Sequence, residues 1–344
     1  MPLDAGAPFC SEHCAEGLVA IAGNTLRIAS IDRLGDAFNS ESVPLRYTPR
    51  RLAHHSVSGH VVVIEADHNA LSADEKVQLY EAAAIPPPLP AGTVLPDDDE
   101  ADGMLMESVV GVPRGGAGKW ASCIRVLDPA ARRTLSVLEL SDNEAAVSIA
   151  AVPLRERGGE TFIVVGTVKD MTLHPRTISS GYLHVYQFAE GNTTLQLVHK
   201  TPVEGVPSAI ASFGGRLLVG VGNRLRLYEM GAKKLLRKAE LKNLPSLVQS
   251  IHVISSQRIV VGDLAESFHY VQYKRADNTL SVFADDVAPR HLTAACALDA
   301  NSLAGADKFG NIFVCRLPRE VGDATLLCSP PPGSCARRSS SVPI

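Results

Sequence analysis

The feature that most constrains the fold of this chain is a recurring strand that ends in glycine. It occurs four times as a short apolar run, in residues 162–166, 217–220, 259–262 and 302–305. The intervals from Gly220 to Gly262 and from Gly262 to Gly305 are about 42 and 43 residues, close to the ~40–50 residues of a four-stranded propeller blade. The first interval, which begins at Gly166, is longer, and a loop at about 170–180 supplies the excess.

A second strand follows each of these glycines, and a third strand often comes next. The second strands alternate in character and span residues 182–186, 225–228, 268–273 and 312–316. One sheet of this size is too small to be stable alone, so neighbouring sheets must stack around a common axis to bury both faces. The sequence therefore predicts an all-β fold, a β-propeller of four-stranded blades of roughly 40–45 residues. A parallel β-helix is the less favoured alternative, because it needs a shorter and more regular period.

The distribution of these strands predicts three parts of the chain. Residues 1–16 form a lead-in segment, and residues 17–318 form an incomplete β-propeller. The propeller opens with two apolar runs on either side of Gly23-Asn24, which is a hairpin signal. Residues 319–344, which are rich in proline, serine and arginine, are expected to be a disordered tail.

An insertion at about residues 68–118 interrupts the strand pattern. It contains a short helical pattern near 73–84, a proline run at 86–90 and an acidic run at 97–102. Such a composition cannot bury enough apolar surface to stay ordered, so the insertion is expected to be flexible. Strands resume at Trp120.

The composition excludes some classes of protein. The formal net charge of the 344-residue chain is −4, whereas general nucleic-acid-binding domains carry a basic face that displaces counter-ions. The seven cysteines are unevenly spaced and odd in number, which suits a reducing compartment better than a disulfide framework. No apolar run has the length of a signal peptide core or of a membrane-spanning helix. We therefore expect a soluble intracellular protein.

One basic cluster is a candidate contact site for RNA or for a protein partner. It consists of Lys233, Lys234, Arg237 and Lys238, on either side of two leucines. This pattern predicts the outer strand of a blade, where long cations suit an exposed edge and also oppose edge-to-edge pairing.

Three other motifs are weaker candidates. Arg50-Arg51 with His54-His55 could bind an anion, but a compact basic cluster on a net-acidic chain is more often a solvated loop. The run Gly115–Lys119 lacks the first glycine and the Ser or Thr of a phosphate-binding loop, so we interpret it as a hinge that ends the insertion. Gly220–Gly222 lacks the third glycine of a dinucleotide fingerprint and joins two strands, so it predicts a tight hairpin.

The sequence does not support metal binding or catalysis. Cys10, His13 and Cys14 are close together, but a zinc site needs four ligands and no second pair lies at a suitable spacing. Asp285 and Asp286 are adjacent, so on a strand they would point to opposite faces and could not share a substrate. No nucleophile elbow or zinc-protease motif is present. We predict no enzyme activity and no cofactor, although a propeller enzyme with a pocket at the central channel is a further alternative.

Specific strings in this chain resemble the splicing factor 3B subunit 3 family. They run in the family's order from the first residues to about Pro318, and they comprise EGLVAI (16–21), NTLRI (24–28), PLRYTPR (44–50), EADHNA (65–70), NEAA (143–146), HKTPVE (199–204), KKLLRK (233–238), FADD (283–286) and GADKFGNI (305–312). The family is similar to the large subunit of the cleavage and polyadenylation specificity factor and to the damaged-DNA-binding adaptor of cullin ubiquitin ligases.

This resemblance implies the third propeller of a three-propeller protein. It also implies a non-catalytic, nuclear scaffold subunit of the splicing factor 3b complex in the U2 small nuclear ribonucleoprotein, which supports branch-site recognition in pre-mRNA splicing. The implied partners are other splicing factor 3b subunits, with U2 RNA and pre-mRNA contacted mainly through the complex, and no membrane or small-molecule substrate. Because fold alone does not decide function, an adaptor of a cullin ubiquitin ligase or of the 3′-end cleavage and polyadenylation complex remains the alternative.

Overall fold

The structure is a computed structural model of the 344-residue chain. The residues that it describes are 5–11, 14–22, 25–30, 42–69, 78, 81–82, 115–116, 118–189, 191–232, 234–318 and 340–343. The chain divides into two compact units, residues 1–43 and residues 44–344. No helix among the described residues is long and apolar enough to cross a membrane.

The first unit contains a three-stranded antiparallel sheet of β1 (Ala5–Ser11), β2 (Cys14–Ala22) and β3 (Thr25–Ser30). Ala22 of β2 pairs with Thr25 of β3, so the predicted hairpin around Gly23-Asn24 is confirmed. Strand β1 and the start of β2 occupy residues for which the sequence predicts only a lead-in segment.

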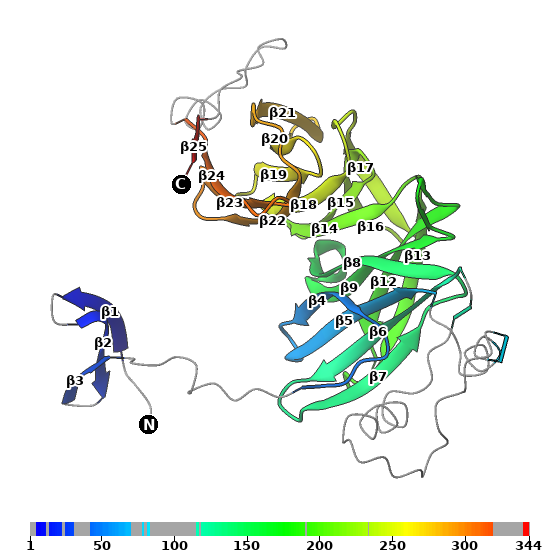
Figure 1. Ribbon diagram of the computed structural model, residues 1–344, viewed down its shortest axis with the longest axis horizontal. Coiled ribbons are helices and arrows are strands. Elements are labelled where there is room, and N and C mark those ends of the chain that lie inside the picture. Colours follow the sequence, from blue (N-terminus) through cyan, green and yellow to red (C-terminus); the bar gives the residue numbers. More distant parts are fainter. Residues whose placement is uncertain are drawn as a thin grey trace. The chain divides into compact units, whose positions relative to one another are not determined.

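The described part of the second unit contains five four-stranded antiparallel sheets, shown in Figure 1. The first comprises β4 (Pro49–His55), β5 (His60–His68), β6 (Trp120–Asp128) and β7 (Arg133–Glu139). The second comprises β8 (Glu144–Leu154), β9 (Glu160–Lys169), β12 (Ser180–Phe188) and β13 (Leu195–Val203). The third comprises β14 (Pro207–Phe213), β15 (Arg216–Val221), β16 (Arg224–Met230) and β17 (Leu235–Leu241).

The remaining two sheets repeat this order. The fourth comprises β18 (Val248–Val253), β19 (Arg258–Asp263), β20 (Ser267–Lys274) and β21 (Thr279–Asp285). The fifth comprises β22 (Leu292–Ala297), β23 (Ser302–Asp307), β24 (Ile312–Arg316) and β25 (Ser340–Pro343). The first strand of each sheet is the inner one, and β4, β8, β14, β18 and β22 lie side by side in that order. The predicted β-propeller of four-stranded blades is therefore confirmed.

Apolar clusters fill the space between successive sheets. Ile64 and Ile124 of the first sheet pack with Ile163 and Val165 of the second. Similar clusters join the second sheet to the third, the third to the fourth, and the fourth to the fifth. Each fully buried Val, Leu or Ile side chain contributes about 1.5–3 kcal/mol relative to an exposed one. Since a single sheet has two apolar faces, stacking is what stabilises the repeat.

The strand-ending glycines have a packing role at these interfaces. A Cβ atom on Gly220 would lie 2.4 Å from a methyl carbon of Val248, the first residue of the next inner strand. A Cβ atom on Gly166 or Gly262 would lie 2.7 Å from the Pro207 carbonyl oxygen or 3.1 Å from a methyl carbon of Leu292, and closer still to a serine hydroxyl of its own sheet. Glycine therefore leaves space for the following sheet and, at these two positions, for a serine of the same sheet.

The strand register shows that Gly305 does not occupy the position of the other glycines in the predicted repeat. Gly262 pairs with Ser250, two residues after the start of β18, and the corresponding pair in the fifth sheet is Ala306 with Ala294. Gly305 lies one position earlier, and a Cβ there would meet Phe313 of its own sheet. The apparent interval of about 43 residues thus ends one residue short of the equivalent position.

Other predictions fall partly outside the described residues. Of the expected insertion helix, Gln78, Glu81 and Ala82 are described and are helical, and most of 68–118 lies outside the described residues. The predicted loop at 170–180 carries a small hairpin of β10 (Thr172–Leu173) and β11 (Arg176–Thr177). In the predicted tail, β25 is a strand that pairs with β24, so those four residues differ from the expectation of disorder. Residues 319–339 and 344 lie outside the described part.

Candidate functional site

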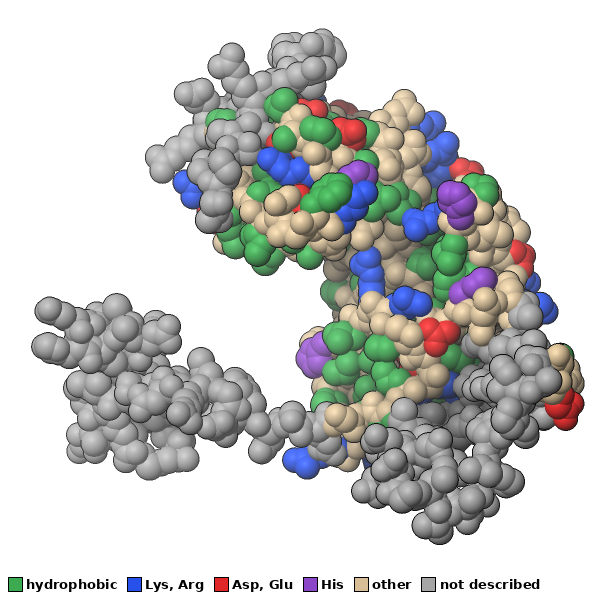
Figure 2. Space-filling model, viewed as in Figure 1, with side chains coloured by type: hydrophobic (Ala, Val, Ile, Leu, Met, Phe, Trp, Pro, Cys, Tyr) green, Lys and Arg blue, Asp and Glu red, His purple; other side chains and the backbone are tan. Residues whose placement is uncertain are grey.

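Four of the inner strands line an open cavity of about 550 Å³. In Figure 2 the surface is hollowed between the sheet that contains β4 and the sheet that contains β22. The lining residues come from β4, β14, β18 and β22, and they are Arg50, Arg51, Ala209, Ile210, Gln249, Ser250, Ile251, His252, Leu292, Thr293, Ala294 and Ala295. A cavity of this size is within the range of ligand-binding pockets.

The lining of this cavity is cationic and partly apolar. It contains Arg50 and Arg51, and none of its described residues is an Asp or a Glu. Arg51 is exposed, although the surrounding walls partly desolvate its guanidinium and lower its pKa below the ordinary value. Burial also lowers the pKa of His252, whose Nε2 lies 3.2 Å from Ser250 Oγ, so the imidazole is held in its neutral form. The arrangement suits an anionic group close to β4.

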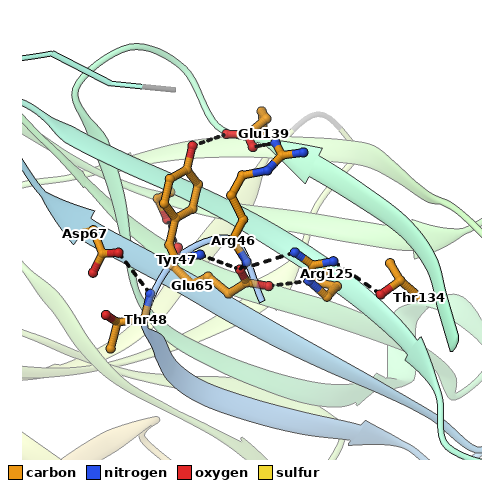
Figure 3. A network of polar contacts seen from close by, with 9 residues as sticks. Arg46, Tyr47, Thr48, Glu65, Asp67, Arg125, Thr134 and Glu139 are labelled. Atoms are coloured by element: carbon orange, nitrogen blue, oxygen red, sulfur yellow. Dashed lines mark hydrogen bonds and ion pairs between the residues drawn. The ribbon is translucent and has the colours of Figure 1, made fainter. Parts of the chain in front are cut away.

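A buried ion pair fixes the segment that leads into β4, as Figure 3 shows. Glu65 is fully buried, and its Oε1 accepts a hydrogen bond from Arg125 Nε at 2.5 Å. Its Oε2 accepts the backbone N–H groups of Arg46 and Tyr47 at 2.9 and 3.0 Å. Arg125 also donates to Thr134 Oγ1 at 3.2 Å. The carboxylate thus holds the 44–48 segment against the first sheet.

Further contacts extend this network to the cavity wall. The backbone N–H of Thr48 donates to Asp67 Oδ2 at 3.1 Å. Arg50 Nε donates to the Ala66 carbonyl at 2.8 Å, and its guanidinium lies 3.8 Å from Asp67 Oδ1. Because these bonds orient the start of β4, the next residue, Arg51, is directed to the cavity.

The structure changes the interpretation of the Arg50-Arg51 and His54-His55 motif. These residues lie in β4, an inner strand, so the predicted loop is wrong, although Arg50, Arg51 and His54 are exposed as a solvated segment would be. The arginines line the cavity, whereas His55 is buried 4.6 Å from the ring of Phe188 and 2.7 Å from Ser58 Oγ. His54 is exposed. The motif therefore does not form one anion site, because its histidines do not join its arginines at the cavity.

The predicted basic cluster lies where the sequence places it, at the outer strand of a sheet. Arg237 and Lys238 are exposed residues of β17, and Lys234 is exposed just before it. Lys233 lies outside the described residues. Lys238 Nζ is 2.9 Å from Glu229 Oε2, and Arg237 Nη1 is 3.3 Å from the carboxylate of Glu240. Two of its four cations are thus already engaged by neighbouring acids.

A second group of ion pairs adjoins this strand, and we call it the Arg226 cluster. It contains four cations around two carboxylates, and its members are Arg224, Arg226, Arg237, Lys242, Glu204 and Glu240. Arg226 is 3% exposed and lies 2.7 Å from Glu240 and 2.8 Å from Glu204. Although burial acts to lower the pKa of Arg226, these hydrogen bonds raise it. The cluster links strands β16 and β17 to the residue after β13.

A buried polar network in the second sheet resembles a catalytic triad only in its residue types. Glu144 Oε1 lies 3.2 Å from His184 Nε2, and His184 Nδ1 lies 2.9 Å from the Tyr186 hydroxyl. Burial acts to raise the pKa of Glu144, but hydrogen bonds from His184, Ser141 and Thr167 lower it to about 2. Since Glu144 and His184 are buried, the network is suited to holding the sheet together.

The other motifs have structural roles or lie outside the described part. Gly118 has a φ of +70°, and Asn69 donates its backbone N–H to the Lys119 carbonyl, so this run closes the insertion in front of β6. Gly222 is in the hairpin between β15 and β16. Cys10 and Cys14 are in β1 and β2, and His13 is not described. Among the described residues, no group of three or more metal-ligating side chains comes together.

The sequence reasoning missed the far wall of the cavity. Gln249, Ser250 and His252 lie in β18, and Thr293 lies in β22. The small and polar residues of these inner strands give a weak strand signal, because one side of each strand faces the cavity. Their position directly before each glycine-ended strand is a signal that could have identified them.

Comparisons with known proteins agree with this architecture. A family model described as the CPSF A subunit region matches residues 121–325. The chain is 44% identical to "Spliceosome-associated protein 130 A" of Arabidopsis thaliana over 93% of the chain and 27% of that protein. It is 43% identical to "Splicing factor 3B subunit 3" of Danio rerio, over the same shares of the two chains. It is 44% identical to "Pre-mRNA-splicing factor rse1" of Neurospora crassa over 94% of the chain and 26% of that protein.

The chain thus spans about a quarter of the length of these curated relatives. The family match covers more than half of the chain, including strands from all five sheets. The resemblance seen in individual strings is therefore confirmed along nearly the whole sequence. The chain belongs to the CPSF A subunit region family.

Proposed function

We propose that this chain is part of a non-catalytic scaffold subunit of the splicing factor 3b complex in the U2 small nuclear ribonucleoprotein. In this role it supports branch-site recognition by holding protein partners in the nucleus. The observation that carries the proposal is the identity of 43–44% over 93–94% of the chain with relatives named as splicing factors. A match of this extent includes the loops and surfaces as well as the apolar core.

The chemistry of the described residues is consistent with a binding role. The buried acids Glu65 and Glu144 are engaged in ion pairs within their own sheets. The thiols of Cys123 and Cys315 are buried, and burial raises the pKa of both, which keeps them in the unreactive protonated form. What the propeller offers a partner is the cavity between its inner strands and its exposed outer strands.

The exposed cations of β17 and the residue before it are a proposed contact for RNA or for a protein partner. Lys234, Arg237 and Lys238 are exposed, and their sheet carries further arginines. Because Glu229 and Glu240 engage two of these cations, an incoming phosphate must compete with two carboxylates. We therefore infer that RNA contacts are mainly indirect.

A nuclear pull-down tests this function. The full chain carries an affinity tag, and the recovered proteins and RNAs are identified by mass spectrometry and by sequencing. We expect splicing factor 3b subunits together with U2 RNA. Absence of both contradicts the proposal, and recovery of a cullin or of cleavage and polyadenylation subunits in their place identifies the alternative adaptor role.

A charge-reversal variant separates direct from indirect RNA contact. In the variant Lys234, Arg237 and Lys238 are each replaced by Glu, and the matched control is Arg275→Glu, which changes an exposed arginine after β20. We expect both variants to recover U2 RNA in proportion to the recovered protein subunits. Selective loss of RNA in the triple variant would indicate a direct contact at β17.

A further inference from the structure

The cavity between the inner strands contains an arginine that has no counter-ion in the described structure. Arg51 lines the cavity and makes no ion pair or side-chain hydrogen bond with any described residue. Its neighbour Arg50 differs, since it donates to the Ala66 carbonyl and lies 3.8 Å from Asp67. Arg51 is exposed, so its guanidinium is accessible to an anion that enters the cavity.

Two buried arginines differ from Arg51 in that each is paired with an acid. Arg125 is paired with Glu65, and Arg226 with Glu240, so their charges are compensated within the fold. Arg51 is exposed, and none of the described residues that line the cavity is an acid. A carboxylate that enters the cavity therefore meets this cation without a competing acid in the described lining.

The opposite walls of the cavity supply neutral polar groups. Gln249 and Ser250 are in β18, close to His252 in the same strand. Thr293 of β22 lines the cavity as well, and its hydroxyl donates to the Ala306 carbonyl at 3.1 Å. Amide and hydroxyl groups can bond both the N–H and the C=O of a bound backbone.

The rest of the lining is aliphatic. The residues without polar side chains are Ala209, Ile210, Ile251, Leu292, Ala294 and Ala295. None of the twelve described lining residues is Phe, Tyr or Trp. A nucleic acid strand binds through several cations and through aromatic rings on which its bases stack. One unpaired cation among aliphatic side chains suits a peptide better.

We propose that this cavity binds an extended segment of a partner protein that carries an Asp or Glu side chain, with the carboxylate on Arg51. The planar guanidinium can hold a carboxylate through two parallel hydrogen bonds. Aliphatic side chains of the same segment pack against Ile210 and Ile251. The volume of about 550 Å³ limits the buried part to a few residues.

The first experiment asks whether one carboxylate decides binding. The full chain is applied to an array of octapeptides of valine and serine, in which a single Glu occupies each position in turn. Matched peptides carry Gln at the same position. We expect retention on Glu peptides at interior positions and at least tenfold less on the Gln peptides. Equal retention on both sets overturns the proposal, as does retention on neither set.

The second experiment assigns the binding to Arg51. Affinity for the best Glu peptide is measured by fluorescence anisotropy for wild type, Arg51→Gln, Arg51→Lys and the control Arg133→Gln, which changes an exposed arginine of β7. We expect a loss of at least tenfold for Arg51→Gln, a smaller loss for Arg51→Lys and none for Arg133→Gln. Thermal unfolding of each variant shows that the fold is retained.

A nucleic acid probe distinguishes the rival ligand. A fluorescent octamer of uridine is titrated into the same four proteins. We expect its affinity to be weaker than that of the Glu peptide and insensitive to Arg51→Gln. Tighter binding of the octamer that is lost in Arg51→Gln would assign the cavity to RNA and overturn the peptide proposal. An unchanged peptide affinity in Arg51→Gln would likewise overturn it.

Discussion

The two basic regions of this propeller differ in how their charges are compensated. In the Arg226 cluster, four cations surround Glu204 and Glu240, and the buried member lies within 2.8 Å of both acids. At the cavity wall, Arg51 has no acid beside it among the described residues. The sequence favours the run of Lys233, Lys234, Arg237 and Lys238, which shares Arg237 with this cluster, because its basic residues are close together along the chain. The structure favours Arg51, because pairing decides whether a cation is available to a ligand.

The difference teaches that an arginine can stabilise the fold or recognise a partner, according to its neighbours. Removing a cation that is satisfied internally leaves a shielded acid without its partner and destabilises the propeller, and such a cation gains little from a ligand. A cation without a counter-ion adds nothing to stability but gains strongly from an incoming anion. Stability and binding measurements on the same variants should therefore give opposite rankings.

The largest effect is expected for Arg226→Met. The substitution keeps the size of the side chain but leaves Glu240, which is 11% exposed, without its closest cation. Removing one member of a buried ion pair costs about 3 kcal/mol in the free energy of unfolding. Urea denaturation measures this loss. Arg237→Met is the matched control, because it contacts the same carboxylate from an exposed position. A loss below about 1 kcal/mol for Arg226→Met would contradict the structural role of the cluster.

A smaller change in the free energy of unfolding is expected when the pH is lowered. Burial acts to raise the pKa of Glu240, but its bonds to Arg226 and the nearby charges of Arg226, Arg237 and Lys242 lower it from the ordinary 4.5. A carboxylate with a lowered pKa stabilises the fold above its unfolded pKa, and this contribution disappears as the pH falls through the folded pKa. The difference in the free energy of unfolding between wild type and Glu240→Gln should therefore be constant above about pH 5 and should become smaller below about pH 4.5. A difference that does not change with pH would refute the ion-pair role.

The exposed pairs of β17 should contribute less. Lys238 is 41% exposed and lies 2.9 Å from Glu229. Exposed ion pairs contribute about 0–1 kcal/mol and are screened by salt. Lys238→Gln should lower the free energy of unfolding by less than about 1 kcal/mol, and the loss should shrink further at high salt. A larger loss that persists in 1 M salt would place Lys238 with the buried cluster.

The smallest effect on stability is expected for Arg51→Gln. Because no described acid balances this arginine, its removal should change the free energy of unfolding by no more than about 0.5 kcal/mol in either direction. The same variant should abolish binding of the Glu peptide. Thermal unfolding and anisotropy on one protein preparation give both values. A destabilisation above about 1.5 kcal/mol would mean that Arg51 is compensated within the fold, and the comparison would fail.

Much of the fold could be predicted from the sequence, because its signals are local. The glycine-ended apolar runs identify β15 and β19, and the runs that follow them identify β16 and β20. The inner strands were missed, since residues such as Ser250 and Thr293 face a cavity and do not alternate clearly between apolar and polar. The displacement of Gly305 from the repeat was also missed, because a one-residue shift changes the sheet register but hardly alters the period.

The candidate site could be predicted only in part. The sequence identifies Arg50-Arg51 and the cations of β17, but it cannot show which of them an acid neutralises. Glu204 and Glu240 are far along the chain from each other, and they reach Arg226 only after the strands have paired. Ion pairing is thus a tertiary property, and counting charges along the sequence does not show which cations are left for a ligand.

The contacts between the second strand of one sheet and the inner strand of the next have a consequence for how such a chain can evolve. Gly166, Gly220 and Gly262 each accommodate a larger residue of the following sheet. At the interface between the first and second sheets the larger residue is on the other side. Ile64 occupies the position that corresponds to these glycines, and it belongs to the same buried cluster as the small Ala146 of the second sheet. If the second sheet were deleted, Ile64 would face Pro207 at a position that fits only glycine. The blades are therefore not interchangeable modules. Their number and order can change only together with the residues at the interfaces between successive sheets.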